Sequence, residues 1–564
     1  MPFTDAAAEL VATLADEGVQ HLFINPGTDT APVQEALAAA RTAGTPSPRA
    51  VLCTHEFVAL SSAMGHHFVT GTPQAVMVHV DAGTLNLGGA WHNAQRNQLP
   101  VVVFAGRSPY TTAADIRGHR DSPIHWQQEQ LDQQAIARAF GKWFMEVPRG
   151  RELGPIVRRA FQVAQSDPRG PAYVTLPREA LMEPGGAGLA RRLRPPRRAA
   201  PDPSGLTEMA RVLAGAQHPV IITGRTGARP DAVASLVELA DLLGAPVVDQ
   251  RDRVNFPARH PLYGGDAAAD VLASADVVLL LDSEVPWIPA LAAPPADATI
   301  LQIDIDPAKA TMPLWTYPVD LALTADTSVA LPLLADALRY LASAAQVDQW
   351  AARRDIVSAR LAEIRQQWDA FAASDDPAAA PHAMMQALNK VLPPRAIVLE
   401  EAVTSRTALI RQIDREPGSF FDTGSPALGW AIGGAMGVKL ARPGAPVFAV
   451  CGDGSFGFGV PTAAFWSAHR AGTPFIAVIL NNQSYRASRL PVGRLYPGGA
   501  GFREGSFPEA DLSPAPDYVG LAAAYGGGGR VVSDSAQLAD AVEYCLTLEA
   551  AGRCAVLDIR LPAA

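Results

Sequence analysis

The stretch CGDGSFGFGVPTAAFWSAHRAGTPFIAVILNNQSY, residues 451–485, holds polar clusters that directly follow two short apolar runs. The run PVFAV leads into GDGS, which contains Asp453, and the run PFIAVIL leads into Asn481 and Asn482. Short apolar runs that end in turn residues and are separated by a helical pattern predict parallel β-strands joined through a helix. Ligands of such sheets bind at the carboxyl ends of the strands, so the stretch predicts both a fold and a site.

The same alternation of short β-rich runs and helical patterns recurs in three segments of the chain. It predicts an α/β protein with three doubly wound parallel-sheet domains. We expect these domains at residues 1–185, 204–345 and 381–564. A linker rich in Pro, Gly and Arg is expected at 186–203, and a helical connector at 346–380.

Composition excludes several classes of protein. The chain has 564 residues, 48% of them hydrophobic and 18% charged, and its formal charge of −10 disfavours nonspecific binding of nucleic acid. The basic run in the linker is short and broken by prolines, so we interpret it as a spacer rather than a nucleic-acid patch. No apolar stretch of about 18 residues is present, so no membrane span is expected.

The N-terminus and the cysteines indicate where in the cell the protein is expected. The N-terminus has neither a basic region nor a long apolar region, so no secretion signal is expected and a cytoplasmic location is predicted. The cysteines Cys53, Cys451, Cys545 and Cys554 form no CxxC pair. We expect buried thiols in a reducing compartment.

The residue types in the opening stretch suit a metal and a phosphate. Asp453 and Asn482 are separated by one βα unit, so they can reach neighbouring strand ends, and their oxygens suit Mg²⁺ or Ca²⁺ rather than zinc. Gly452 and Gly454 allow close approach of the backbone, and Ser455 is expected to begin a helical segment whose N–H groups favour a phosphate. The stretch therefore predicts a diphosphate that carries Mg²⁺. The alternative is an ordinary turn, because GDG alone is common.

The pattern GDGS…NN resembles the diphosphate-binding motif of the thiamine-diphosphate enzymes, a family that includes pyruvate decarboxylase, acetolactate synthase and benzoylformate decarboxylase. The resemblance implies that Asp453, Asn482 and the backbone carbonyl of Ser484 are Mg²⁺ ligands. It also implies that Gly452, Gly454, Ser455 and Asn482 contact the cofactor. The gap between Asp and Asn is slightly longer than in the family, which leaves the contacts of the loop GFGVPTA open.

The first segment, from THEFVALSSAMGHHFVTG to QLPVVVFAG, resembles the pyrimidine-binding domain of that family. The resemblance implies that Glu56 binds the aminopyrimidine ring and supports proton removal from the cofactor. The alternative for Glu56 is an acid favoured at a helix N-terminus by the helix dipole.

Two further residues match the benzoylformate decarboxylase branch. Thr28, in the loop NPGTD, takes the place of an active-site serine. His79, at the end of the run AVMVHV, matches an active-site histidine and would transfer protons or orient the substrate carboxylate. The alternative for His79 is a structural role. The segment LLLDSEVPWIPALAAP has no match to the second histidine of that branch, so the resemblance does not imply that benzoylformate is the substrate.

Other segments complete the resemblance. Leu428, in TGSPALGWAIGG, matches the aliphatic wedge under the cofactor, and Thr404 and Ser405, in EEAVTSRT, would donate to the diphosphate. After the Asn pair, Arg486 and Arg489 would lie near the substrate or in solvent. The central segment GRTGARPDA lacks the spacing GxGxxG, so FAD is not expected.

The resemblance implies an enzyme that uses thiamine diphosphate and Mg²⁺ to decarboxylate a 2-oxo acid, followed by protonation or by carboligation as in acetolactate synthase. An aldehyde lyase or a dione hydrolase of the same family remains an alternative. A non-catalytic relative is disfavoured by the presence of Glu56 and Asp453, and a nucleotide-dependent oxidoreductase by the missing GxGxxG. The resemblance also implies a homodimer or homotetramer with active sites at subunit interfaces, a small-molecule substrate, and no nucleic-acid or membrane partner.

Overall fold

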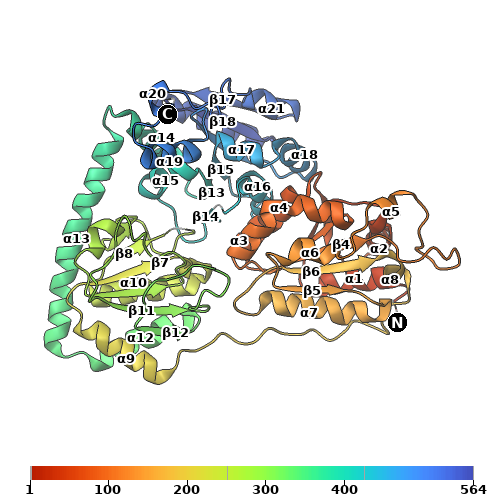
Figure 1. The fold of residues 1–564 in the computed structure, drawn as a ribbon, viewed down its shortest axis with the longest axis horizontal. Coiled ribbons are helices and arrows are strands. Elements are labelled where there is room, and N and C mark those ends of the chain that lie inside the picture. Colours follow the sequence, from red (N-terminus) through yellow and green to blue (C-terminus); the bar gives the residue numbers. More distant parts are fainter. Residues whose placement is uncertain (1–2, 251, 425, 563–564) are drawn as a thin grey trace.

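The computed structural model describes residues 3–250, 252–424 and 426–562. Within these ranges the chain forms three six-stranded sheets in which all paired strands are parallel. The first sheet and its helices lie at the right of Figure 1, the second at the lower left and the third at the top. The predicted α/β class with three doubly wound sheets is confirmed.

The first sheet has the strand order β2-β1-β3-β4-β6-β5. Its strands are β1 (His21–Ile24), β2 (Arg49–Leu52), β3 (Gln74–Val78), β4 (Val101–Arg107), β5 (Trp143–Glu146) and β6 (Ala172–Pro177). Its helices are α1 (Ala6–Asp16), α2 (Ala31–Ala43), α3 (Glu56–Thr70), α4 (Val80–Arg96), α5 (Ile124–Gln127), α6 (Gln133–Arg138), α7 (Leu153–Gln165) and α8 (Arg178–Met182). The inner strands β3, β4 and β6 are almost wholly buried, as expected for parallel strands covered on both faces.

The second sheet has the order β12-β11-β10-β7-β8-β9, so the chain reverses its direction of travel across the sheet between β7 and β10. Its strands are β7 (Pro219–Thr223), β8 (Val247–Asp249), β9 (Tyr263–Gly265), β10 (Val277–Leu281), β11 (Thr299–Asp304) and β12 (Leu321–Thr324). Its helices are α9 (Pro203–Gly215), α10 (Pro230–Leu243), α11 (Ala268–Leu272) and α12 (Thr327–Leu341). The reversal is the switch point at which open α/β sheets form a crevice.

The third sheet has the order β14-β13-β15-β16-β18-β17. Its strands are β13 (Ile397–Glu401), β14 (Phe420–Asp422), β15 (Val447–Gly452), β16 (Ile476–Asn481), β17 (Gly528–Val532) and β18 (Ala555–Arg560). Its helices are α14 (Ala380–Val391), α15 (Arg406–Gln412), α16 (Trp430–Ala441), α17 (Asp453–Phe458), α18 (Pro461–Ala471), α19 (Arg486–Leu495), α20 (Ala500–Glu504), α21 (Tyr518–Ala524) and α22 (Leu538–Ala550). The two apolar runs of the opening stretch are the neighbouring strands β15 and β16, which lie at the centre of the sheet.

Two boundaries differ from the sequence-based expectation. His79 does not end a strand, because β3 stops at Val78 and His79 is the N-cap of α4. The helix after β15 begins at Asp453 rather than at Ser455. In both places the backbone turns into a helix as soon as the strand leaves the sheet.

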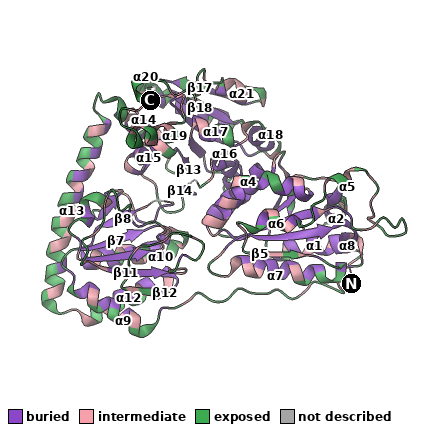
Figure 2. Ribbon diagram, viewed as in Figure 1, coloured by how far each residue is buried: buried purple, intermediate pink, exposed green. Residues whose placement is uncertain are grey.

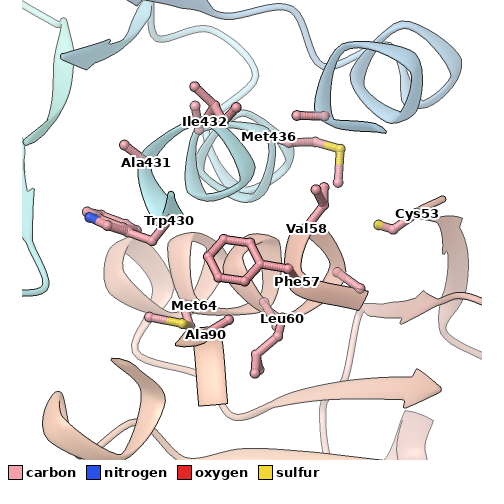
Figure 3. Packing of buried hydrophobic residues seen from close by; sticks show 14 of the residues in the cluster. Cys53, Phe57, Val58, Leu60, Met64, Ala90, Trp430, Ala431, Ile432 and Met436 are labelled. Atoms are coloured by element: carbon pink, nitrogen blue, oxygen red, sulfur yellow. The ribbon is translucent and has the colours of Figure 1, made fainter. Parts of the chain in front are cut away.

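Helices α3 and α16 join the first and third sheets through one hydrophobic core, which Figure 3 shows from close by. Phe57, Val58 and Met64 on α3 lie in the same buried cluster as Trp430 and Met436 on α16. Glycines let the two backbones approach, because a Cβ at Gly65 would overlap the carbonyl of Gly434, and one at Gly437 would overlap that of Ser62. The start of α3, where Glu56 lies, is therefore held against the third sheet's helix.

Two connections complete the chain. A segment without helix or strand runs from α8 to α9 along the bottom of Figure 1, and the long helix α13 (Ala344–Ala372) stands at the left edge. Figure 2 shows that the strands of the sheets are mostly buried, whereas α13 is largely exposed. Among the described helices, none has the length and apolar character needed to cross a membrane. All four cysteines are free and buried, which confirms the predicted buried thiols.

Candidate active site

The first half of the site lies at the carboxyl ends of β1, β2 and β3, which are neighbours in the sheet. Glu56 follows β2, begins α3 and is only 3% exposed. Asn25, after β1, donates from Nδ2 to its Oε1 at 3.0 Å, and Asn86, on α4, donates from Nδ2 to its Oε2 at 3.1 Å. Both carboxyl oxygens are engaged, so the two asparagines fix the orientation of Glu56. The sequence analysis did not single out either asparagine.

His79 lies in the same half and is paired with a buried acid. Its Nδ1 is hydrogen-bonded to Oδ1 of Asp29, a side chain that is 2% exposed, and its Nε2 lies 2.9 Å from Oε1 of Gln128. The hydrogen bond with Asp29 raises the pKa of His79 above its usual value, against the lowering effect of burial. Because both ring nitrogens face oxygen acceptors, the imidazolium form satisfies both contacts.

The backbone around this pair is shaped for close contact. A Cβ at Gly27 would overlap the His79 ring, and one at Gly106 would overlap the Asp29 carboxyl, so both positions require glycine. Val80, directly after His79, has φ +32, a conformation that costs energy for a β-branched residue. Such strain persists where the surrounding structure holds it, as at functional sites.

Thr28 lies on the loop between β1 and α2, directly before Asp29. Its Oγ1 is 3.4 Å from Nε2 of His125, a buried histidine whose pKa is lowered chiefly by desolvation. The structure therefore brings Thr28, His79 and Glu56 to one edge of the first sheet. Asp29, His125 and Gln128 were missed, because only the folded chain brings their partners next to them.

The second half of the site lies at the carboxyl ends of β15 and β16. Asp453 Oδ1 accepts a hydrogen bond from the N–H of Gly454 at 2.9 Å. Its Oδ2 is buried and has no hydrogen-bond partner among the described residues. Burial raises the pKa of Asp453, against the lowering effect of nearby backbone N–H groups of Gly454, Gln483 and Ser484. On the next strand end, Asn482 Oδ1 accepts from the N–H of Ser484 at 3.0 Å.

A cavity of about 440 Å³ opens at these strand ends. The residues that line it include every one predicted for this half of the site: Thr404, Ser405, Leu428, Gly452, Asp453, Gly454, Ser455, Asn482 and Ser484. Arg486 also lines it, whereas Arg489 stacks on Phe507 instead. Two non-glycine residues with positive φ lie beside the cavity, Val403 at +49 and Gln483 at +55, which again places strained backbone at the site.

The donors around the cavity fit a magnesium diphosphate. Among the described residues, no group of three or more His, Cys, Asp or Glu could hold a metal ion. One carboxylate with a free oxygen and one amide oxygen match the way Mg²⁺ binds, through few protein oxygens plus phosphate and water. Gly452 leaves open space for a ligand beside the backbone, whereas the ring of Tyr485 fills the space at Gly454.

Glu401 is a buried residue of this half that the sequence analysis did not single out. It accepts hydrogen bonds from the N–H groups of Gly429 at 2.6 Å, Trp430 at 3.2 Å and Ala431 at 3.1 Å. These contacts anchor the start of α16 and so fix Leu428 at the cavity wall. Desolvation raises the pKa of Glu401 to about 8.

Among the described residues, the 440 Å³ cavity is lined only by the second half of the site. None of the described residues that line the 440 Å³ cavity comes from the first sheet or its helices. Glu56 and His79 therefore lie outside the cavity that contains Asp453.

Comparison with known proteins gives matches along the whole chain. Three family models of the thiamine pyrophosphate enzymes match in order: the N-terminal TPP binding domain at residues 4–136, the central domain at 206–334 and the C-terminal TPP binding domain at 403–559. Each match contains strands of one of the three sheets.

Individual proteins support the same grouping. The chain is similar to benzoylformate decarboxylase of Pseudomonas aeruginosa, with 27% identity over 553 residues that cover 95% of each chain. It is similar to acetolactate synthase of Mycobacterium avium, with 26% identity over 549 residues that cover 92% of this chain and 82% of the relative. Its fold is like that of the thiamine diphosphate-dependent 4-hydroxybenzoylformate decarboxylase of Rhodococcus jostii, with a TM-score of 0.78, 24% identity and 99% of each chain covered. The chain belongs to the family of thiamine-diphosphate-dependent enzymes.

Proposed function

We propose that this chain uses thiamine diphosphate and Mg²⁺ to decarboxylate a small 2-oxo acid. The observation that carries the proposal is the buried Oδ2 of Asp453, which has no hydrogen-bond partner among the described residues and lies beside Asn482 in a cavity at two strand ends. A carboxylate oxygen without a partner in a buried position is costly unless a ligand completes it. Similarity to benzoylformate decarboxylase along nearly the whole chain supports the same class of reaction.

The third sheet would bind the cofactor's diphosphate. Asp453, Asn482 and the Ser484 carbonyl are the proposed Mg²⁺ ligands, which suit a hard cation. The backbone at Gly452, Gly454 and Ser455 and the hydroxyls of Thr404 and Ser405 are the proposed diphosphate contacts. Leu428 is the proposed wedge under the cofactor.

The first sheet would supply the proton chemistry. When bound, thiamine diphosphate supplies a nucleophilic carbon and accepts the electrons left by the departing carbon dioxide. Glu56, held by two asparagines, exchanges a proton with the pyrimidine ring nitrogen. His79 in its imidazolium form is a proton donor and a charge partner for the substrate carboxylate. Thr28 positions the substrate beside it.

The active site would lie between two copies of the chain. Glu56 does not line the cavity around Asp453 in one chain, and each cofactor would contact the first sheet of one copy and the third sheet of another. Closed symmetric assembly then gives a homodimer, or a homotetramer built from dimers.

Carboligation is the second candidate outcome, supported by the similarity to acetolactate synthase. The early steps are shared, and the product distinguishes the two: an aldehyde follows from protonation, a hydroxyketone from addition to a second carbonyl compound. An aldehyde lyase or dione hydrolase would release no carbon dioxide from any 2-oxo acid.

The proposal is tested by measuring carbon dioxide release from a panel of 2-oxo acids, including pyruvate and benzoylformate, with and without thiamine diphosphate and Mg²⁺. We expect cofactor-dependent release that falls by about 10²–10⁴-fold in Glu56→Gln, the size of a lost acid–base group. Glu35→Gln is the matched control, because Glu35 is exposed on α2. No release from any acid, with the cofactor shown to bind, would contradict a decarboxylase.

A further inference from the structure

The segment between β4 and β5 carries a second histidine close to the first half of the candidate site. His125, on the short helix α5 at the right of Figure 1, is 4% exposed, and its Nε2 lies 3.4 Å from Oγ1 of Thr28. Three residues later, Oε1 of Gln128 lies 2.9 Å from Nε2 of His79. One segment thus places a polar side chain against each of two predicted site residues.

Two arginines hold the backbone around His125. Arg120 donates to the carbonyl of His125 at 3.0 Å and pairs with Glu129 at 2.6 Å. Arg178, on α8, pairs with Asp121 at 3.2 Å. The Arg120 and Arg178 side chains are only 10% and 9% exposed, so their charges are partly shielded from water. The imidazole of His125 is therefore held in a set position next to Thr28.

The contacts of the His125 ring determine which of its nitrogens carries the proton. The backbone N–H of Asp121 donates to Nδ1 at 3.3 Å. Because an N–H donor requires a lone pair on its acceptor, Nδ1 is unprotonated and the proton of the neutral ring lies on Nε2. The carboxylate of Asp121 is also 3.4 Å from Nδ1, but it is 57% exposed and pairs with Arg178, which weakens its attraction for a proton on Nδ1. Nε2 of His125 therefore donates to the hydroxyl of Thr28.

The surroundings of His125 also favour the uncharged ring. Desolvation is the largest cause that lowers its pKa, and the positive charges of Arg178 and Arg120 lower it further. The negative charges of Asp121 and Asp29 act in the opposite direction but do not reverse the shift. A pKa below the usual value of about 6.5 leaves His125 uncharged at neutral pH.

The two histidines of the first half thus have opposite pKa shifts. The pKa of His79 is raised, chiefly by its hydrogen bond with Asp29, whereas burial lowers the pKa of His125. Two titratable groups whose surroundings push their pKa values apart can take different parts in one reaction. His79 can carry a positive charge, while His125 remains a neutral donor.

We propose that His125 is a positioning residue for the substrate: its Nε2–H donates to Thr28, and the hydroxyl of Thr28 donates in turn to an oxygen of the 2-oxo acid. This role rests on the proposed function. Thr28 is exposed in the single chain, so its hydroxyl can meet a substrate. A hydroxyl that accepts one hydrogen bond becomes a stronger donor in the next. When the carbonyl carbon of the substrate is attacked, its oxygen gains negative charge, so the donor from Thr28 is strongest where it lowers the barrier.

The first test measures the proton position in the cofactor-free protein and does not depend on the proposed function. Histidine is labelled with ¹⁵N, and the signals lost in His125→Gln identify His125 in long-range ¹H–¹⁵N spectra. We expect a proton on Nε2 and none on Nδ1 at neutral pH, and a change of the Nε2 signal in Thr28→Val. A proton on Nδ1, or a charged His125 ring at neutral pH, would overturn the proposal.

Kinetics with the cofactor-loaded protein then test the role itself. Thr28→Val should lower kcat/KM by about 10²-fold, the cost of losing one donor to a developing oxyanion, and His125→Phe by about tenfold. The double variant should be no slower than Thr28→Val, because both changes remove parts of one relay. His125→Gln should recover most of the activity, since its amide nitrogen can donate in place of Nε2.

Controls separate this role from a structural one. His218→Phe is the matched control, because His218 is exposed directly before β7, and it should leave kcat/KM unchanged. If His125→Phe does not fold, His125→Asn replaces it, because the shorter side chain cannot reach Thr28. Additive losses in the double variant, or a folded His125→Phe with wild-type kcat/KM, would overturn the proposal. A wild-type protein that releases no carbon dioxide, although His125 has the expected proton position, would contradict the proposed function but not the contact between His125 and Thr28.

Discussion

At the scale of single residues, the proton chemistry proposed for the first half of the site depends on the pair His79 and Asp29. Asp29 is buried, and its Oδ1 contacts the Nδ1 of His79. Gly27 and Gly106 make room for the pair, so its geometry is built into the backbone.

The pair predicts a pH dependence. The pKa of His79 is raised above its usual value of about 6.5 by Asp29. The pair therefore contributes its full stabilisation to the fold at pH values below the usual histidine pKa. This stabilisation is lost as the pH rises through the raised pKa of His79. If protonated His79 is the active form, kcat/KM falls over the same rise, and Asp29→Asn moves that fall to lower pH. The measurement is the pH profile of kcat/KM; an unmoved profile would rule out the pair, and exposed Asp115→Asn is the control.

Substitution of Asp453 is expected to affect Mg²⁺ binding and protein stability differently. Burial raises the pKa of Asp453 in the folded, cofactor-free protein above that of an ordinary carboxyl group. Ionisation of this carboxyl group therefore lowers the stability of the cofactor-free fold as the pH rises from the ordinary carboxyl pKa through the raised pKa. Asp453→Asn should leave the cofactor-free protein as stable as wild type or more so, yet raise the Mg²⁺ concentration needed for activity at least about tenfold. The measurements are thermal unfolding without cofactor and a Mg²⁺ titration after chelation. An unchanged Mg²⁺ requirement would show that Asp453 is not a Mg²⁺ ligand. Asp511→Asn, at an exposed position, is the control.

At the scale of elements, the packing of α3 on α16 places Glu56. In Gly437→Ala, the new methyl group would overlap the Ser62 carbonyl, so the helices must separate. We expect a loss of about 1–3 kcal/mol in the free energy of unfolding, typical of overpacking, together with a fall in kcat/KM as Glu56 shifts. Gly215→Ala, in α9, meets open space and should cause neither effect. Equal behaviour of the two variants in denaturant titrations would show that this contact is unimportant.

The elements also show how far the sequence predicts the structure. Central strands such as β15 and β16 were predicted because parallel strands buried on both faces are almost wholly apolar. The edge strands β2, β14 and β17 were not predicted, because they are short and mix polar or small residues with apolar ones. Their pairing is set by the neighbouring strand rather than by their own pattern.

Some residues of the candidate site could likewise be predicted from the sequence and others could not. Asp453 and Asn482 were found because they directly follow strands that the sequence makes evident. Gln128 and Asp29 were missed because their partner His79 lies 49 and 50 residues away in the chain. Only tertiary contacts bring such residues together. The catalytic and ligand roles assigned to all of these residues stay predictions.

At the scale of the whole molecule, the candidate site residues lie in two separate parts of the chain. The first and third sheets are fixed to one another through α3 and α16, yet Glu56 and the cavity around Asp453 remain apart within one chain. The central claim is that Glu56 of one copy and Asp453 of another act on the same cofactor. Each copy alone would then be inactive.

The measurement that tests this claim most directly mixes two inactive variants, Glu56→Gln and Asp453→Ala, and follows thiamine-diphosphate-dependent carbon dioxide release. In a mixed dimer one of the two sites has both residues intact, so random reassembly of equal amounts in a closed symmetric dimer predicts about a quarter of wild-type activity. Variants that are refolded separately and never mixed serve as the control and should stay inactive. Recovered activity would establish both residues and the shared site. A mixture that stays inactive although mixed dimers form, or a single variant that keeps full activity, would contradict the account.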